Sequence, residues 1–114
     1  MELSSKILFV TGTDDTFRKP LLETQGYTVR TANIDNALRQ LSMEKFKLAL
    51  ITTEHGITRT IVLCEQLKSA QPELRVGVLA QHSDDIPSTC VDIVLRMQYS
   101  PAKFLAAIRI VMEG

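Results

Sequence analysis

The stretch that most constrains the fold is Phe46–Thr53, which reads FKLALITT. Four consecutive apolar residues stand at its centre, with a lysine before them and two threonines after them. A run this short, bounded by polar residues, is typical of a strand that is buried on both faces in a parallel sheet. Open parallel sheets bind ligands at the edge where their strands end. The residues from Thr52 to Glu54 therefore bear most directly on function.

Strand and helix patterns alternate along the rest of the chain. Apolar runs and period-two alternation predict the other strands, which are Lys6–Thr11, Tyr27–Ala32, Leu74–Ala80 and Val91–Leu95. Apolar residues at helical spacing predict four helices: one that begins or kinks near Pro20 and ends near Gln25, one capped by Asn33 or Asp35, one over Arg59–Ala70, and one that Ser100 and Pro101 open.

This alternation predicts an α/β fold. We expect a single domain over residues 1–114, with a doubly wound five-stranded parallel sheet in the flavodoxin-like order 2-1-3-4-5. Only the decapeptide Gln81–Cys90 separates the fourth strand from the fifth, and it contains Pro87. A crossover between parallel strands usually needs about a dozen residues or more with a full helix. The fourth crossover is therefore predicted to be shortened or irregular.

The balance of charge limits the classes of partner. Thirteen basic and thirteen acidic residues cancel, so no global field favours nucleic acid or anionic lipid. No apolar run approaches the roughly 18 residues of a membrane span. We predict a cytoplasmic protein without a direct nucleic-acid or membrane partner. Cys64 and Cys90 form no CxxC pair, so the sequence indicates core-filling side chains rather than a disulfide or a thiolate metal site.

Several segments resemble the receiver domains of bacterial two-component response regulators, the CheY-like family. The resemblance spans Lys6 to Met112 and rests on the first strand KILFV, the pair Gly26 and Tyr27 after the first helix, Phe46 at the start of the third strand, and the pair Ser100 and Pro101 before the last helix. It implies the same sheet order that the alternation of elements predicts.

The family transfers a phosphoryl group from a histidine kinase to an aspartate at the end of the third strand. Acidic residues after the first strand hold Mg²⁺, and a hydroxyl after the fourth strand and a lysine after the fifth sense the phosphoryl group. By resemblance, the phosphoacceptor position falls on Thr52, the acidic pair on Thr11 and Gly12, and the two sensing positions on Ala80 and Arg96.

These departures remove the family's chemistry, because a threonine cannot form an acyl phosphate. The resemblance therefore implies a pseudo-receiver that is not an enzyme, needs no cofactor and acts as a phosphorylation-independent interaction module. Its partner would be a protein, an output domain or a second copy in a homodimer. We expect the binding surface to comprise Gln81–Cys90, Arg96–Tyr99 and the exposed side of the last helix, with apolar anchors at Ile86, Met97 and Tyr99.

Two alternatives keep the carboxyl edge of the sheet chemically active. In one, Asp14 or Asp15 binds Mg²⁺ and Glu54 accepts the phosphoryl group. Glu54 lies two residues beyond the position that the resemblance assigns to the phosphoacceptor, however, and is predicted to face differently. In the other, imidazole and carboxylate side chains following the strands hold zinc, manganese or iron, or simply form a solvated acidic surface. Those side chains are Asp14, Asp15, Glu54, His55, His82, Asp84 and Asp85.

A further alternative is a flavodoxin-like nucleotide or flavin site. Four hydroxyl or glycine positions in the loop Thr11–Thr16 lie between a strand and a helix, where flavodoxins hold the phosphate of flavin mononucleotide. Asp14 and Asp15 would repel that phosphate, and only Tyr27 and Tyr99 are available to stack on a flavin, since the chain has no tryptophan.

Overall fold

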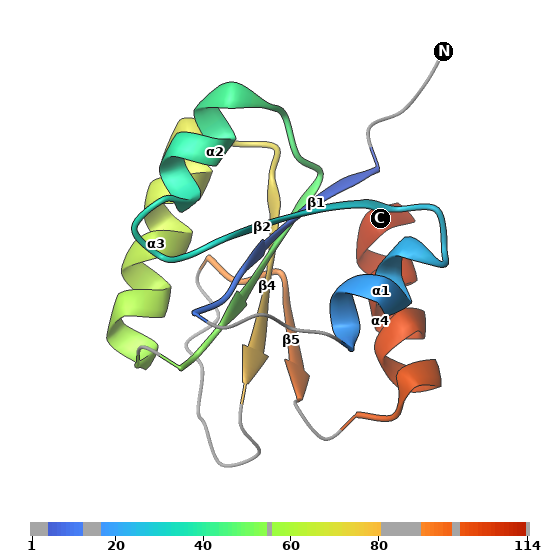
Figure 1. Cartoon of the computed structure of the whole chain (residues 1–114). Helices are drawn as coiled ribbons and strands as arrows, with labels where there is room; N and C mark the ends of the chain where they lie inside the picture. Colours follow the sequence, from blue (N-terminus) through green and yellow to red (C-terminus); the bar gives the residue numbers. More distant parts are fainter. Residues whose placement is uncertain (1–4, 13–16, 55, 81–89, 97–98, 114) are drawn as a thin grey trace.

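The computed structural model describes residues 5–12, 17–54, 56–80, 90–96 and 99–113. Strands and helices alternate along the chain (Figure 1). Their bounds are β1 Lys6–Val10, α1 Arg18–Glu23, β2 Thr28–Ala32, α2 Ala37–Met43, β3 Leu48–Thr52, α3 Ile57–Ala70, β4 Arg75–Ala80, β5 Ile93–Arg96 and α4 Pro101–Glu113. In the described part of the chain, no helix is long and apolar enough to cross a membrane.

The five strands form one parallel sheet in the order β2-β1-β3-β4-β5, which confirms the predicted architecture. All strands therefore end at the same side of the sheet, which we call the carboxyl edge. The register aligns Val10 with Ile51, Thr52 with Leu79, and Ala80 with Arg96. The carboxyl ends of β1, β3, β4 and β5 consequently lie next to one another.

The central strand β3 is buried along its whole length, as its apolar run predicts. Its side chains alternate between two hydrophobic clusters. Ala49 and Ile51 pack with α2 and α3, whereas Leu48 and Leu50 pack with α1 and α4. Figure 1 shows these two pairs of helices on opposite sides of the sheet. The fold is therefore a three-layer sandwich in which helices cover both faces of β3.

The first helix tolerates a proline because of its position. Pro20 is the third residue of α1, where the missing amide is one of the first four that have no partner within a helix. The helix ends at Glu23, two residues before the predicted end, and Gly26 then takes a φ of +91°, a left-handed conformation that favours glycine. The predicted start near Pro20 is confirmed.

The prediction that Asn33 or Asp35 caps the second helix is wrong. The residue before α2 is Asn36, which makes no side-chain cap hydrogen bond. Asn33 instead stabilises the turn ahead of the helix, because its Oδ1 accepts hydrogen bonds from the amides of Asp35 at 3.1 Å and Asn36 at 3.0 Å. The serine predicted to cap the last helix does so, since Ser100 Oγ accepts a hydrogen bond from the amide of Lys103 at 3.2 Å.

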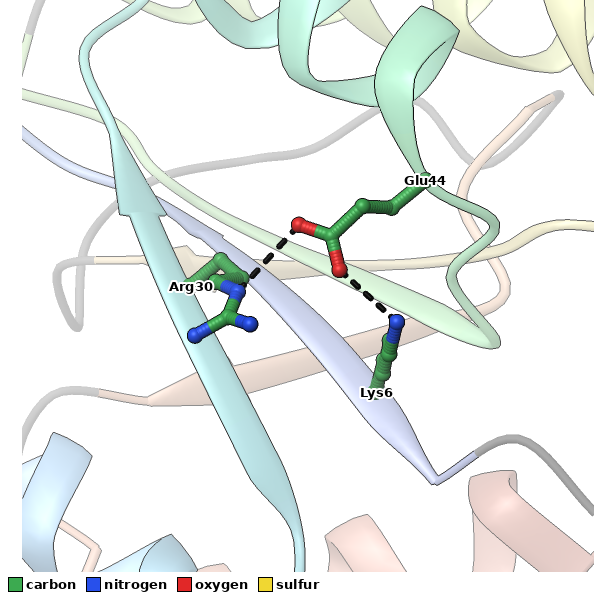
Figure 2. A network of polar contacts seen from close by, with 3 residues as sticks. All are labelled: Lys6, Arg30 and Glu44. Atoms are coloured by element: carbon green, nitrogen blue, oxygen red, sulfur yellow. Dashed lines mark hydrogen bonds and ion pairs between the residues drawn. The ribbon is translucent and has the colours of Figure 1, made fainter.

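A carboxylate fastens the end of α2 to the two neighbouring strands at the sheet edge. Glu44 accepts hydrogen bonds from Lys6 Nζ at 2.8 Å and Arg30 Nε at 3.2 Å (Figure 2). The hydrogen bond from Lys6 lowers the pKa of Glu44, and the hydrogen bond from Arg30 lowers it further. Desolvation by burial acts in the opposite direction but does not outweigh them. The contact lies near the starts of β1 and β3, away from the carboxyl edge.

A second carboxylate fixes the entry to β5. Asp92 Oδ2 accepts hydrogen bonds from the amide of Val76 and from Lys68 Nζ, both at 2.7 Å, and the Asp92 amide donates to the Val76 carbonyl at 2.8 Å. Strand β5 accordingly begins at Ile93, two residues later than predicted, because Asp92 uses its side chain to bind the neighbouring strand. The fourth crossover, which is predicted to be shortened or irregular, consists largely of residues 81–89 and lies outside the described residues.

Candidate functional site

Adjacent strands bring Thr11 and Thr52 together at the carboxyl edge. Thr52 ends β3 and is only 8% exposed, while Thr11 follows β1 directly and is half-buried. Thr52 Oγ1 also lies 3.5 Å from the carbonyl oxygen of Val10. The position that the resemblance equates with the phosphoacceptor is therefore a nearly buried hydroxyl at the centre of this edge.

Glu54 reaches back over the ends of β1 and β3. Its Oε1 accepts hydrogen bonds from Thr52 Oγ1 at 2.8 Å and from Thr11 Oγ1 at 3.1 Å. A tight turn permits this arrangement, since the amide of Gly56 donates to the carbonyl of Thr53 at 2.9 Å and Gly56 takes a φ of +98°. Glu54 was predicted to face differently from the position that the resemblance assigns to the phosphoacceptor, but its carboxylate lies against the hydroxyl of Thr52 because the chain turns after β3.

The two threonine hydroxyls and the Glu54 carboxylate form what we call the Thr–Glu cluster: Thr11, Thr52 and Glu54. Its chemistry is hydrogen bonding to a carboxylate. Each hydroxyl donates a hydrogen bond to the same carboxylate oxygen. The negative charge of Glu54 is thereby stabilised by hydroxyls from the ends of both β1 and β3. A threonine hydroxyl cannot become an acyl phosphate, so Thr52 cannot take the nucleophilic role of an aspartate.

The described residues do not match an acidic Mg²⁺ site. Thr11 and the exposed Gly12 are the residues that the resemblance equates with the acidic pair, and neither supplies a carboxylate. Glu54 does carry one, but two hydroxyls already bind its Oε1. Among the described residues, no three His, Cys, Asp or Glu side chains gather as metal ligands. Asp14 and Asp15 lie outside the described residues.

The two sensing positions also lie at the carboxyl edge, and they are side by side. Ala80 is fully buried in the cluster that packs under α2 and α3, and it pairs in register with Arg96 on β5. Arg96 is half-buried and carries a planar guanidinium where the family has a lysine. Alanine has no hydroxyl that could donate a hydrogen bond to a bound oxyanion. Of the hydroxyl and the cation that the resemblance implies here, only the cation is present, on Arg96.

The predicted partner surface is described only in part. Ile86 and Met97 lie outside the described residues. Tyr99 is half-buried against the cluster under α1 and α4, and Lys103 Nζ lies 4.4 Å from the centre of its ring. On the outer side of α4, Ile110 is 70% exposed. Tyr99 therefore serves first as packing for α4, and its role as a binding anchor stays a prediction.

The other proposed sites fall largely outside the described residues. His55, His82, Asp84 and Asp85 belong to that part of the chain, so the mixed imidazole and carboxylate site stays a prediction. The same holds for a flavin phosphate loop, because residues 13–16 are not described. Tyr27 packs half-buried against the cluster under α1 and α4. The residue pattern did not predict that the Glu54 carboxylate folds back onto Thr11 and Thr52. Gly56, two positions later, is the sequence feature that could have indicated a turn here.

No protein-family model matches the chain, and no curated protein matches it in sequence. Solved structures match it over nearly its whole length. A response regulator from Thermotoga maritima has a TM-score of 0.86 at 20% identity, covering 98% of this chain and 100% of that one.

A CheY-like receiver domain protein from Methanospirillum hungatei JF-1 has a TM-score of 0.80 at 21% identity, covering 97% and 95% of the two chains. The beryllofluoride-activated NtrC4 receiver domain dimer has a TM-score of 0.81 at 18% identity, covering 96% and 97%. The chain thus has the fold of CheY-like receiver domains.

Proposed function

We propose that this chain is a response-regulator receiver domain that works without aspartyl phosphorylation, as a protein-interaction module. One observation carries the proposal. The side chain at the end of β3 is the threonine Thr52, and its hydroxyl donates to the carboxylate of Glu54 at 2.8 Å. The receiver-like fold supports the signalling class, and the Thr–Glu cluster supports the loss of phosphoryl chemistry at its centre.

The charge of Glu54 adds a second obstacle to phosphorylation. A phosphoryl group at the end of β3 would bring at least one further negative charge close to this carboxylate. At separations of a few ångströms, like charges near a protein surface repel by a few kcal/mol. The hydroxyls of Thr11 and Thr52 stabilise one carboxylate by hydrogen bonding, but they carry no positive charge to offset a second anion.

The partner in this proposal is a protein: an output domain or a second copy of the chain. Two of the similar structures support these options. The NtrC4 receiver domain is a dimer, and the match to NtrX from Brucella abortus covers 97% of this chain but only 26% of the NtrX chain. On this chain, the outer side of α4 with exposed Ile110 offers apolar surface for such contact. Ile86, Met97 and Tyr99 remain the proposed anchors.

A small phosphoryl donor tests the loss of phosphorylation. We expect that acetyl phosphate with Mg²⁺ leaves the intact mass of the purified chain unchanged, because Thr52 cannot form an acyl phosphate. A conventional receiver domain treated in parallel serves as the positive control. The variant Glu54→Gln locates any adduct: a phosphoryl group that appears on the parent chain and disappears in this variant would show that Glu54 is the acceptor, and would overturn the proposal.

A further inference from the structure

Two cysteines far apart in sequence meet on the face of the sheet that α2 and α3 cover. Cys64 on α3 is fully buried, and its Sγ donates to the carbonyl oxygen of Cys90 at 3.1 Å, across 26 positions of sequence. Cys90 is half-buried and packs against the same hydrophobic cluster as Cys64. Neither cysteine belongs to the Thr–Glu cluster. The contact is therefore separate from the proposed site at the carboxyl edge.

Helix α3 holds the segment that enters β5 at two points, one helical turn apart. Cys64 contacts the main chain of Cys90, and Lys68 Nζ binds Asp92 Oδ2 at 2.7 Å. The ion pair fixes the distance between the helix and the segment, so the main chain of Cys90 is held beside the thiol of Cys64. Burial raises the pKa of the Cys64 thiol, and the neighbouring Cys90 thiol raises it further.

We propose that Cys64 and Cys90 are a reversible modification site, at which a peroxide-class oxidant produces an intramolecular disulfide. Cys90 is the more exposed of the two and would therefore meet the oxidant first, and the fully buried Cys64 would be the resolving thiol. The disulfide would join α3 to the residues that precede β5 and so enclose the fourth crossover. This inference does not depend on the proposed function, because no residue of the pair takes part in it.

The reaction balances with hydrogen peroxide as the oxidant. The Cys90 thiolate attacks one peroxide oxygen, so that a sulfur–oxygen bond forms, the oxygen–oxygen bond breaks and hydroxide leaves, to be protonated to water. The Cys64 thiolate then attacks the sulfur of the Cys90 sulfenic acid. The sulfur–sulfur bond forms, the sulfur–oxygen bond breaks and a second water leaves. Two thiols lose two electrons and two protons, and the peroxide takes up both.

The buried position of Cys64 sets the order and pace of these steps. The thiolate is the attacking species, so a thiol with a raised pKa attacks slowly at neutral pH. The second step should therefore be slower than the first and should accelerate as the pH rises. A disulfide at this place would also restrict the unfolded chain, so the oxidised form should melt at a higher temperature than the reduced form.

Thiol trapping with mass spectrometry tests the pair on the full chain. The reduced protein is treated with hydrogen peroxide under native conditions, denatured in iodoacetamide and mapped by peptide mass. At the end of the reaction we expect both cysteines to have escaped alkylation, with a loss of two hydrogen atoms from the monomer, a rate independent of protein concentration, and full reversal by dithiothreitol. Oxygen adducts that persist on Cys90 at that end point with Cys64 still alkylated, or disulfides only between chains, would overturn the proposal.

Single variants separate the two roles. In Cys64→Ser the resolving thiol is absent, so Cys90 should accumulate oxygen adducts instead of a disulfide. In Cys90→Ser the remaining Cys64 should stay reduced at the same peroxide dose, because it is buried. Circular dichroism of both variants shows whether they fold. If either fails to fold, the concentration and pH dependence of the parent chain decide the question, since a rate that does not rise with pH would contradict the assigned roles.

Discussion

Replacing Thr52 by aspartate should destabilise the fold by about 3 kcal/mol at pH 7, because it places a second carboxylate beside Glu54 in a nearly buried position. Thr52 Oγ1 lies 2.8 Å from Glu54 Oε1, and Thr52 is 8% exposed. Two carboxylates at such a separation cannot both ionise at ordinary cost, so one of their pKa values should rise. Thr52→Asp should therefore lose stability relative to the parent as the pH rises through that value.

Two further variants isolate the repulsion from other effects of the substitution. Thr52→Val keeps the shape of the side chain and adds no charge, so it should cost only about 1 kcal/mol, the worth of one hydrogen bond. The double variant Thr52→Asp with Glu54→Gln removes the second charge and should recover most of the lost stability. Urea unfolding of all four proteins measures these differences. Equal losses in the single aspartate and the double variant would show that Glu54 does not face Thr52.

Replacing Asp92 by alanine should destabilise the fold by about 2 kcal/mol at pH 7, since it removes a charged acceptor from two donors at once. The amide of Val76 and Lys68 Nζ, both 2.7 Å from Asp92 Oδ2, would lose their partner. Asp35→Ala is the matched control, because its partner Arg59 lies 3.4 Å away on an exposed surface and such pairs contribute little. Chemical unfolding at pH 7 compares the two.

The same substitution should alter the dependence of stability on pH. Burial acts to raise the pKa of Asp92, but the hydrogen bonds from Lys68 and from the Val76 amide outweigh it and hold the pKa below its ordinary value of 3.8. A carboxyl with a lowered folded-state pKa stabilises the protein above the unfolded value, and this contribution disappears as the pH falls through the folded value. The gap between parent and Asp92→Ala should thus be full at pH 7 and narrow below about pH 4. A gap that stays constant on acidification would show that the carboxylate charge is not responsible.

The sheet was predictable because the amino-acid composition of its strands reflects how deeply they are buried. Continuous apolar runs predict β1, β3 and β4 nearly to the residue, since strands covered on both faces contain little else. The first residue of β5 was less predictable. Its start at Ile93 depends on Asp92 binding a strand sixteen positions earlier, and local patterns contain no information about a contact at that distance.

The candidate site was predictable in its residue types but not in its geometry. The end of β3 places Thr52 at the carboxyl edge, as the apolar run indicates. The direction of Glu54 depends on a turn with Gly56 at positive φ, which reverses the chain after the strand ends. Cys64 and Cys90 show the same limit, because the pairing of a helix with the entry to β5 brings them together. Side chains that meet through turns and tertiary packing are beyond what spacing along the chain can show.

The most direct test of the missing phosphorylation chemistry is an amide-proton NMR titration with Mg²⁺ followed by beryllofluoride, which mimics an aspartyl phosphate. We expect no specific shifts at Thr11, Thr52 or Glu54, and none at Ala80 or Arg96, because the Thr–Glu cluster offers no aspartate for beryllofluoride to bind. Saturable shifts at the ends of β1 and β3 with Mg²⁺, which spread to Ala80 and Arg96 when beryllofluoride is added, would contradict this and identify a working phosphorylation switch.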